Sequence, residues 1–371
     1  MAIRFDKDTR RATNGPMIFF SDPSAEISLG EEIRGAIEAK LSFYTYRRPG
    51  DMMISFGSSE SVVKGVEVPG FVIAPFLPDL PYLTIPYRPP FGLHKKDELS
   101  AIDFHYSFPS YSTTRQQHRK EIEAIRRQLD EIGFGKIVAA RAIVENQKID
   151  PAATFAYLCR KYPDAFVFCF STPLTGCWVG ASPELLLEAH VATLKTMALA
   201  GTRRAHTPGE WDTKNIEEQQ MVTDFIAEAF KKNNLPIVVG STFTKCAGQI
   251  EHICTPISSP IDLSGFSTSQ LTNLLNDLSP TPALCGLPRE IALRIISENE
   301  DFSRGFYGGF CGPYHAPGDF SFYVNLRSAN IEQDRVCVFV GGGITRMSDP
   351  ELEWEETSLK STTVMSALVL E

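Results

Sequence analysis

The arrangement of apolar periodicities along the chain is the feature that most limits its fold. Apolar runs typical of β-strands occur at roughly 165–172, 175–181, 184–197, 320–330 and 335–341. These runs follow one another in hairpin-like groups, whereas the strands of a doubly wound parallel sheet alternate with helices. The sequence therefore predicts an α+β fold with largely antiparallel sheets.

Helical periodicity predicts the other elements. Apolar residues recur at helical spacing near residues 113–132, 151–162, 214–232, 268–276, 287–299 and 350–369. A threonine cap precedes the first helix, and Gly133 and Gly135 separate it from a predicted strand at 136–146. Asp349 and Pro350 have the residue types of an N-cap and a first helical position, so they fix the start of the last helix.

The first 110 residues differ from the rest of the chain. They are rich in Pro, Phe and Tyr and show only weak periodicity. Residues 71–90 contain short apolar runs interrupted by prolines, a pattern typical of edge strands and turns.

The charge of the chain argues against several classes of partner. The sequence has 36 Lys and Arg residues and 45 Asp and Glu residues, a formal net charge of −9 at pH 7. Proteins that bind nucleic acid or anionic membranes carry clustered basic residues, and this sequence has no long basic run. An anionic small molecule remains compatible with the acidic total, because a pocket can be locally cationic.

Targeting and redox features predict a cytoplasmic protein. The N-terminus is charged and lacks the apolar core of a signal peptide, and no stretch reaches the roughly 20 apolar residues that cross a bilayer. The eight cysteines form no C-x-x-C pair, and several of them, such as Cys169 and Cys337, lie inside apolar runs. We therefore expect buried free thiols in a reducing compartment.

Glu218 lies in line with the apolar stripe of the helix at 214–232, one turn before Val222. A buried carboxylate is costly unless a cation pairs with it, so this position indicates an Arg, Lys or metal-ion partner. The alternative is a solvated glutamate in the first turn of the helix, where acids suit the helix dipole.

Glu353, Glu356 and Lys360 share one face of the last helix. They could form exposed ion pairs, or they could form a metal and anion site at the edge of the core. Oxygen-only ligands of this kind suit Mg²⁺, which takes one or two carboxylates and keeps several waters.

Lys136 and Glu184 each begin an apolar segment. Burial would favour the neutral form of both side chains, which suits Lys136 as a general base and Glu184 as a general acid. The alternative for each is a residue at a strand end with its charged group in water.

Arg327 lies within the predicted strand 320–330, where a buried guanidinium needs a fixed anion such as a ligand carboxylate. Glycines recur at predicted strand ends, at Gly201, Gly308–Gly309 and Gly341–Gly343. They allow close approach of the backbone to an anion, although tight turns explain them equally well. None of them forms a dinucleotide-binding or P-loop motif.

In order along the chain, these segments resemble the chorismate-utilising enzymes, a family that contains isochorismate, salicylate, anthranilate and aminodeoxychorismate synthases. The matching segments are KIVAAR (136–141), GASPELLL (180–187), ALAGTRR (198–204), the stretch 214–222, SPTPALCG (279–286), RGFYGGFCG (304–312), LRSA (326–329), GGGI (341–344) and EWEETSLK (353–360). The resemblance implies the family's β-sandwich surrounded by helices. It also implies one composite domain over residues 1–371, with a divergent part at 1–110 and the active-site motifs in 110–371.

The resemblance implies a role for each candidate residue. Lys136 matches the base that activates water for attack at C2 of chorismate, and Glu184 matches the acid that protonates the departing C4 hydroxyl. The remaining matches are metal ligands and substrate-binding groups: Glu218 and Glu356 on Mg²⁺, with Glu353 close by; Gly201 and Thr202 near the ring carboxylate; Arg327, Lys360 and the loop Gly341, Gly342 and Gly343 on the enolpyruvyl carboxylate; and His252 near the site.

Ala283 and Leu284 indicate the subtype, because the pair resembles isochorismate synthases, whereas the lyases of the family typically carry Thr or Ser at the first position. We therefore expect an Mg²⁺-dependent isochorismate synthase that acts on chorismate as a monomer, without a glutaminase subunit. The alternatives are a salicylate- or anthranilate-type lyase that releases pyruvate, and an inactive family member that only binds a ligand. Menaquinone, siderophore and salicylate biosynthesis all remain open as the pathway.

Two residues depart from the family's usual helical motif. Asn215 stands where the family usually has Asp, and Gln219 where it has His. Neither change removes a proposed metal ligand, but both affect the groups that support one.

Overall fold

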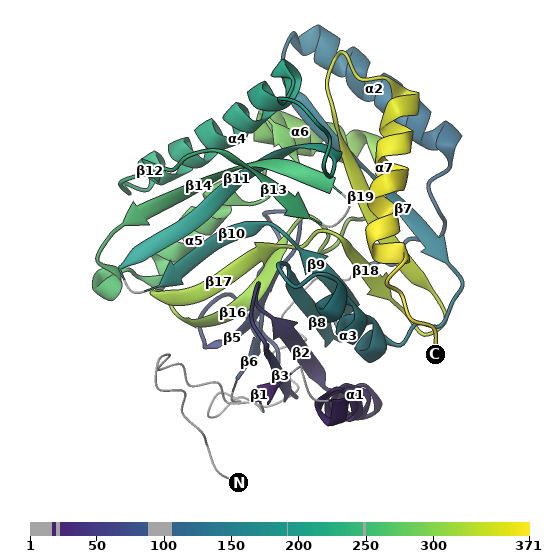
Figure 1. Cartoon of the computed structure of the whole chain (residues 1–371), viewed down its shortest axis with the longest axis vertical. Helices are drawn as coiled ribbons and strands as arrows, with labels where there is room; N and C mark the ends of the chain where they lie inside the picture. The colour runs from purple at the N-terminus through teal and green to yellow at the C-terminus, as the bar shows by residue number, and fades with distance from the viewer. Residues whose placement is uncertain (1–16, 20–22, 88–105, 191, 248–249) are drawn as a thin grey trace.

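The computed structural model describes residues 17–19, 23–87, 106–190, 192–247 and 250–371 (Figure 1). Its helices are α1 (Pro23–Glu38), α2 (Arg115–Ile132), α3 (Pro151–Lys161), α4 (Thr213–Lys232), α5 (Thr268–Leu278), α6 (Arg289–Asn299) and α7 (Pro350–Met365). The caps expected for two of them are present, since Thr114 forms a capping box at the start of α2 and Asp349 accepts hydrogen bonds at the start of α7. The last helix ends at Met365, four residues earlier than expected.

The strands form two sheets, and each strand pair in the described residues is antiparallel. The nine-stranded sheet has the order β1 (Met17–Phe19), β3 (Met53–Ser59), β2 (Ser42–Arg47), β8 (Phe166–Thr172), β9 (Gly176–Ser182), β18 (Ser328–Ile331), β19 (Val336–Ile344), β7 (Lys136–Glu145) and β15 (Gly286–Leu287). The ten-stranded sheet has the order β12 (Val238–Val239), β14 (Ile250–Pro260), β11 (Thr193–Arg204), β10 (Leu185–His190), β17 (Asp319–Val324), β16 (Phe310–Ala316), β5 (Gly70–Ala74), β6 (Leu83–Pro86) and β4 (Val63–Lys64), with β13 (Phe243–Ala247) paired to β14.

Strand β8 shows why the two sheets form a sandwich covered by helices. Phe166, Phe168 and Phe170 belong to the core between the sheets, and the Phe166 ring stacks on Tyr323 of the other sheet with 4.2 Å between centroids. The alternate residues Val167 and Cys169 belong to a second core beneath α1, α3 and α7. Because side chains alternate across a strand, a strand buried on both faces reads as one continuous apolar run. The predicted α+β sandwich surrounded by helices is confirmed.

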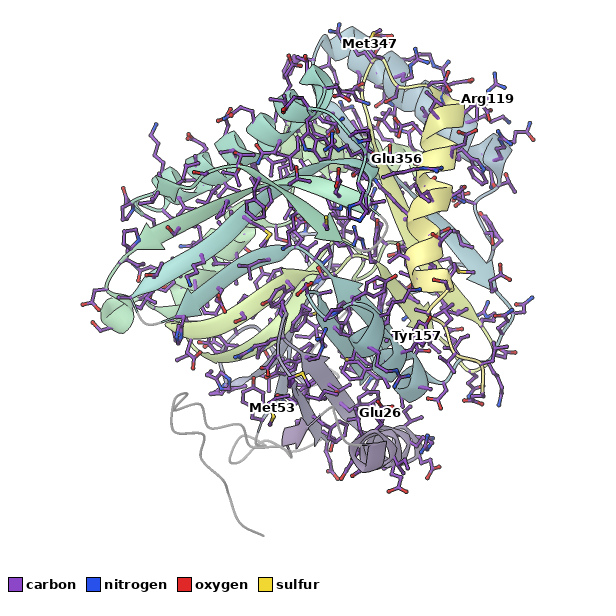
Figure 2. All side chains as sticks on the ribbon, in the orientation of Figure 1. Glu26, Met53, Arg119, Tyr157, Met347 and Glu356 are labelled. Carbon is purple, nitrogen blue, oxygen red and sulfur yellow. The ribbon has the colours of Figure 1, made fainter. Side chains whose placement is uncertain are left out.

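The helices cover both outer faces of the sandwich. Helices α1, α3 and α7 pack on the nine-stranded sheet, and α2 and α6 pack on its β7 end, while α4 lies along β11 and β14 and α5 lies beside α4 (Figure 1). Figure 2 labels Glu26 on α1 and Tyr157 on α3, two helices that the ion pair from Arg160 to Glu26 links at 2.6 Å. The first part of the chain supplies strands to both sheets, with β2 and β3 in one and β4 to β6 in the other.

Three strand predictions are wrong in detail. The run 184–197 is a hairpin of β10 and β11, and the run 320–330 is two strands, β17 and β18, that belong to different sheets. Strands β5 and β6 are interior strands rather than edge strands, because the proline of β6 is its last residue and the other prolines of this segment lie outside the two strands. Residues 88–90 of that prediction lie outside the described residues.

The thiols behave as the apolar runs predict. All eight cysteines are free, and Cys169 and Cys337 are buried, whereas Cys246 is exposed. Within the described part of the chain, no helix is both long and apolar enough to cross a bilayer.

Candidate active site

The candidate site lies where the chain passes from one sheet to the other. Pro183 and Glu184 connect β9 to β10, and residues 325–327 connect β17 to β18. The two crossings lie side by side, because the Val324 N–H donates to the Glu184 carbonyl at 3.1 Å and the Ala181 N–H donates to the Arg327 carbonyl at 3.2 Å. Arg327 is therefore not within a strand, as expected from the sequence, but in a connection with a left-handed φ of 50°.

A cavity of about 320 Å³ opens at these crossings, a volume that suits a small-molecule ligand. Its walls come from β7, β11, β14, β19, α4 with the preceding Asp212, α7, the two connections, and the segments that carry Ala283–Leu284 and Tyr307. All but one of the residues expected at the site line it: Lys136, Glu184, Gly201, Thr202, Glu218, His252, Ala283, Leu284, Arg327, Gly341, Gly343, Glu353, Glu356 and Lys360. Gly342 does not line the cavity. Residues from segments more than 200 positions apart thus converge on one site.

Glu184 is 5% exposed, so it is not the solvent-facing strand residue of the alternative interpretation. Burial raises the pKa of its carboxyl to about 7, against the opposing effects of the Thr281 hydroxyl and of the positive charges on Lys245, Lys136 and Arg327. A carboxyl that is protonated near neutral pH can act as a general acid.

Lys136 is also buried, at the first position of β7, and its amine pairs with Glu218 at 2.5 Å. Glu218 therefore has the cation that its place on the apolar stripe of α4 predicts. Burial opposes ionisation of this carboxyl, but the attraction of Lys136 and its hydrogen bond outweigh that effect and lower the pKa of Glu218. The ion pair joins the strand that carries the proposed base to the helix that carries a proposed metal ligand.

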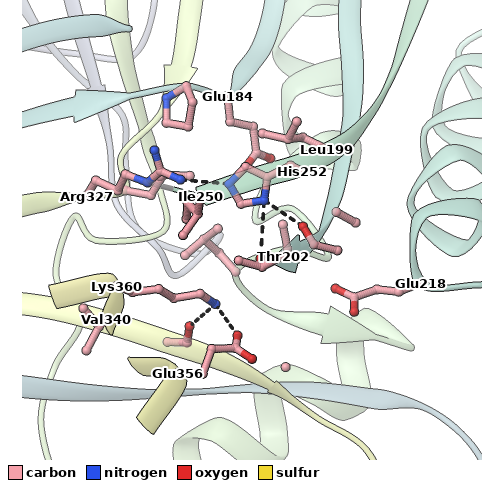
Figure 3. Close-up of a pocket in the computed structure, with 18 of the residues that line it drawn as sticks. Glu184, Leu199, Thr202, Glu218, Ile250, His252, Arg327, Val340, Glu356 and Lys360 are labelled. Carbon is pink, nitrogen blue, oxygen red and sulfur yellow. Dashed lines mark hydrogen bonds and ion pairs between the residues drawn. The ribbon is translucent and has the colours of Figure 1, made fainter. Parts of the chain in front are cut away.

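His252 links two parts of the cavity wall (Figure 3). Its Nδ1–H donates to the Gly201 carbonyl at 2.7 Å, and its Nε2 accepts from the Arg327 guanidinium at 2.8 Å. Burial and then the Arg327 charge lower the pKa of His252 to about 3, so the imidazole is neutral and can accept that bond. The imidazole thus holds the guanidinium at the cavity rather than titrating near neutral pH.

Lys360 and Glu356 form the opposite wall, and Glu356 lies on the side of α7 that faces the ten-stranded sheet (Figures 2 and 3). The Lys360 amine pairs with Glu356 at 2.8 Å and donates to the Gly341 carbonyl at 3.0 Å. The Lys360 charge lowers the pKa of Glu356. Glu353, one turn earlier, is buried with its Oε2 unpaired, and burial followed by repulsion from Glu356 raises its pKa.

Gly341, Gly342 and Gly343 lie inside β19 and not in a loop, which corrects the expectation from the sequence. They leave space for side chains of β7 and α7. A Cβ on Gly343 would lie 2.3 Å from Cε of Lys136, and a Cβ on Gly342 would lie 2.7 Å from Oε2 of Glu353. The glycines thus make room for the side chains of the site.

The two departures from the family motif have defined contacts. Oδ1 of Asn215 accepts from the Thr202 N–H at 3.2 Å, so a side chain of this chain already engages that amide. Gly201 has a φ of +66°, and Asn215 occupies the space that a Cβ there would need. Gln219 is buried and donates to Thr255 at 2.7 Å, which makes it a structural contact between α4 and β14.

The charge of the cavity lining is nearly balanced. Among the described residues that line it, four are cationic (Lys136, Lys214, Arg327 and Lys360) and five are acidic (Glu184, Asp212, Glu218, Glu353 and Glu356). No group of three acidic, histidine or cysteine side chains within the described residues converges closely enough to form a metal centre. The unpaired oxygen of Glu353 beside Glu356 is nevertheless an arrangement that a hard cation would stabilise.

Lys245 is a neighbour of the site that the sequence analysis missed. Its amine donates to the Pro183 carbonyl at 2.9 Å, directly before Glu184. It belongs to β13, which the sequence analysis also missed, and no recognisable motif contains it.

A family model identifies the family to which the chain belongs. Residues 94–369 match the family model of the chorismate binding enzymes, which is more than half of the chain, and the chain belongs to this family.

Several similar proteins are named as isochorismate synthases. The chain is 30% identical to isochorismate synthase MenF of Escherichia coli strain K12 over 279 residues, and 32% identical to the chloroplastic isochorismate synthase of Catharanthus roseus over 273 residues. These matches include 70% and 67% of this chain but only 63% and 45% of the relatives, so the chain spans about half to two thirds of their length. The solved structure of MenF from Escherichia coli has the same fold, with a TM-score of 0.73 and 21% identity over 88% of this chain and 89% of that one.

Proposed function

We propose that the protein is an isochorismate synthase, which interconverts chorismate and isochorismate. The observation that carries this proposal is that a buried, protonatable Glu184 and a buried Lys136 line one cavity, which Arg327 and Lys360 also line. An acid and a base support addition of water at one carbon and loss of a hydroxyl at another. Two further cations suit a substrate with two carboxylates.

In the proposed reaction, the neutral amine form of Lys136 takes a proton from the water that attacks C2, and Glu184 gives a proton to the C4 hydroxyl, which leaves as water. One water is consumed and one is released, so the net change is an isomerisation. His252 holds the Arg327 guanidinium through the 2.8 Å hydrogen bond, and Lys360 is fixed by the Gly341 carbonyl, so both cations are oriented before a carboxylate binds.

We include Mg²⁺ as the cofactor, with Glu218, Glu356 and Glu353 as the residues that would hold it. The donor types suit a hard cation, because all three are carboxylates that line one cavity and one oxygen of Glu353 has no hydrogen-bond partner. Binding would have to draw these carboxylates together, since they do not converge within the described residues. The cavity lining has five acids against four cations, so a dianionic substrate needs additional positive charge. A bound Mg²⁺ would supply that charge and polarise a substrate carboxylate.

A lyase that releases pyruvate is the second candidate function within the family. The residue that favours the synthase is Ala283, which lines the cavity and carries no hydroxyl beside Leu284. The lyases of the family that this chain resembles typically have Thr or Ser at this position.

Incubation of the purified protein with chorismate and Mg²⁺, followed by chromatography of the products, tests the proposal. We expect isochorismate without stoichiometric pyruvate. Pyruvate with salicylate would replace the proposal by the lyase, and absence of any product would support a member of the family that only binds a ligand.

A further inference from the structure

Strand β13 places one basic side chain beside the site. Lys245 lies directly opposite His252 in the antiparallel pair of β13 and β14. Residues that are opposite one another in a pair project from the same face of the sheet, so Lys245 projects to the face on which His252 lines the cavity. Of the four residues of β13 whose side chains are described, Lys245 is the one that is not exposed.

The amine of Lys245 is fixed by a specific acceptor. It donates to the carbonyl of Pro183 at 2.9 Å and lies 3.6 Å from the sulfur of Met197. Lys245 is not among the residues that line the cavity, whereas Pro183 and Glu184 are. The amine therefore contacts the peptide that carries the acid without itself lining the cavity.

The placement of this charge is costly, which indicates that it has a role. Burial lowers the pKa of Lys245, partly offset by Cys254 and Glu184. The groups that act on Glu184 from the packed elements are the Thr281 hydroxyl, Lys245 of β13, Lys136 of β7 and Arg327 of the β17–β18 connection. Among these, Lys136 has its own carboxylate partner, Glu218, and Arg327 bonds to His252, whereas Lys245 contacts the peptide of Glu184 itself.

We propose that Lys245 is a positioning residue for Glu184: it fixes the Pro183–Glu184 connection, and its charge sets the upper limit of the pH range in which Glu184 is protonated and active. This inference rests on the proposed function of Glu184 as the acid. The charge on Lys245 favours ionised Glu184, so its removal moves that limit to higher pH. Loss of the hydrogen bond also loosens the backbone of the acid.

The test compares Lys245→Met with Lys245→Arg and with Lys195→Met, an exposed lysine of β11 in the same sheet. We expect Lys245→Met to lower kcat severalfold with KM within about twofold, because the side chain does not line the cavity. In this variant we expect the pH at which kcat falls on the alkaline side of its pH profile to rise by about one unit. This is the order of the effect that one nearby opposite charge has on a pKa. Lys245→Arg keeps the positive charge, so the alkaline fall of kcat should stay at its wild-type pH. Lys195→Met should change neither kcat nor the pH of that fall.

Two results would overturn the inference. If Lys245→Met has the wild-type kcat and pH profile, Lys245 does not position Glu184. An equal loss of kcat in Lys245→Met and Lys245→Arg, with the alkaline fall of kcat at its wild-type pH, would show that the lysine only maintains the fold.

A titration separates failure of this inference from failure of the proposed function. The ¹³C-carboxyl signal of Glu184, assigned by its absence in Glu184→Gln, reports the midpoint of Glu184 directly in the whole protein. We expect a higher midpoint in Lys245→Met even if the wild-type protein fails to convert chorismate. An unchanged midpoint refutes the electrostatic role whatever the reaction is.

Discussion

Replacement of Gly343 by Ala tests whether the position of Lys136 controls turnover. Gly343 lies in β19 beside β7, and a Cβ at this position would lie 2.3 Å from Cε and 3.1 Å from Nζ of Lys136. The φ of Gly343 is not in the left-handed region, so the backbone accepts alanine without strain. The added methyl group therefore acts mainly on the lysine side chain.

The size of the effect follows from this geometry. Ordinary contact with a Cβ begins at 3.4 Å, so the Lys136 side chain has to move by about 1.1 Å. Its 2.5 Å bond to Glu218 does not survive such a shift in the same geometry. A misplacement of about 1 Å in a catalytic group costs on the order of 100-fold in rate, or about 2.7 kcal/mol in the barrier. The overpacking itself costs about 1–3 kcal/mol of folding free energy.

The assay measures kcat for chorismate with saturating Mg²⁺, together with the free energy of unfolding in urea. Lys136→Ala, which we expect to fold and to lose turnover, provides the lower limit of activity. Gly35→Ala is the matched control, because apart from its chain neighbours and the backbone of its own helix, no atom lies within 4 Å of a Cβ at that position of α1. A folded Gly343→Ala protein with wild-type kcat would refute the reasoning, since a displaced Lys136 could not then be the base.

Three other perturbations test the site and its surroundings. Glu218→Gln removes a carboxylate charge from the proposed Mg²⁺ site, so we expect at least about a tenfold higher Mg²⁺ concentration at half-maximal rate; an unchanged titration would count against this ligand. Because burial raises the pKa of Glu184 to about 7, its contribution to stability is complete below pH 4.5 and is lost as the pH rises through 7. Relative to Glu184→Gln, the free energy of unfolding of the wild type should therefore fall by up to about 3 kcal/mol over this window, and parallel curves in urea would contradict the burial argument. Burial and then Arg141 lower the pKa of His118 to about 4, so its stabilising contribution is lost as the pH falls from 6.5 to 4. In His118→Phe the free energy of unfolding should therefore fall less steeply between pH 6.5 and 4 than in the wild type. An equally steep fall would show that His118 does not cause it.

The predictable parts of the fold are those that local periodicity encodes. The apolar run of β8 and the caps of α2 and α7 depend on neighbouring residues, and the structure has them where the sequence indicates. The division between β17 and β18 was not predicted, because an apolar run does not reveal which sheet each half joins. The polar residues Asn325 and Arg327 were the available signal, and a left-handed Arg327 marks the crossing. Strand β14 was missed because its prolines argue against a strand, while pairing with β11 over most of its length outweighs them.

The sequence predicts which residues belong to the site, but it does not predict which of them contact one another. The position of Glu218 on an apolar stripe indicated a cation, yet only the fold identifies Lys136 as that cation, 82 residues away. The glycines of β19 indicated that other atoms come close to this backbone. In the structure these atoms belong to side chains of β7 and α7, and the glycines do not form a tight turn. Lys245 had no signal at all, since its role depends on a cross-strand neighbour and on a carbonyl 62 residues away.

The pairing of charges in the cavity bears on the strength of the proposed Mg²⁺ dependence. Lys136 and Lys360 are each bonded to a carboxylate of the same cavity, and Arg327 is held by His252. A substrate dianion that entered this lining alone would compete with those carboxylates for the same cations. With Glu184 protonated, the lining still holds four acids against four cations, so two further negative charges would remain without compensation. Because unpaired charges are costly in a buried site, chorismate should bind far more weakly without a divalent cation than with one, and Mg²⁺ should be required rather than merely stimulatory.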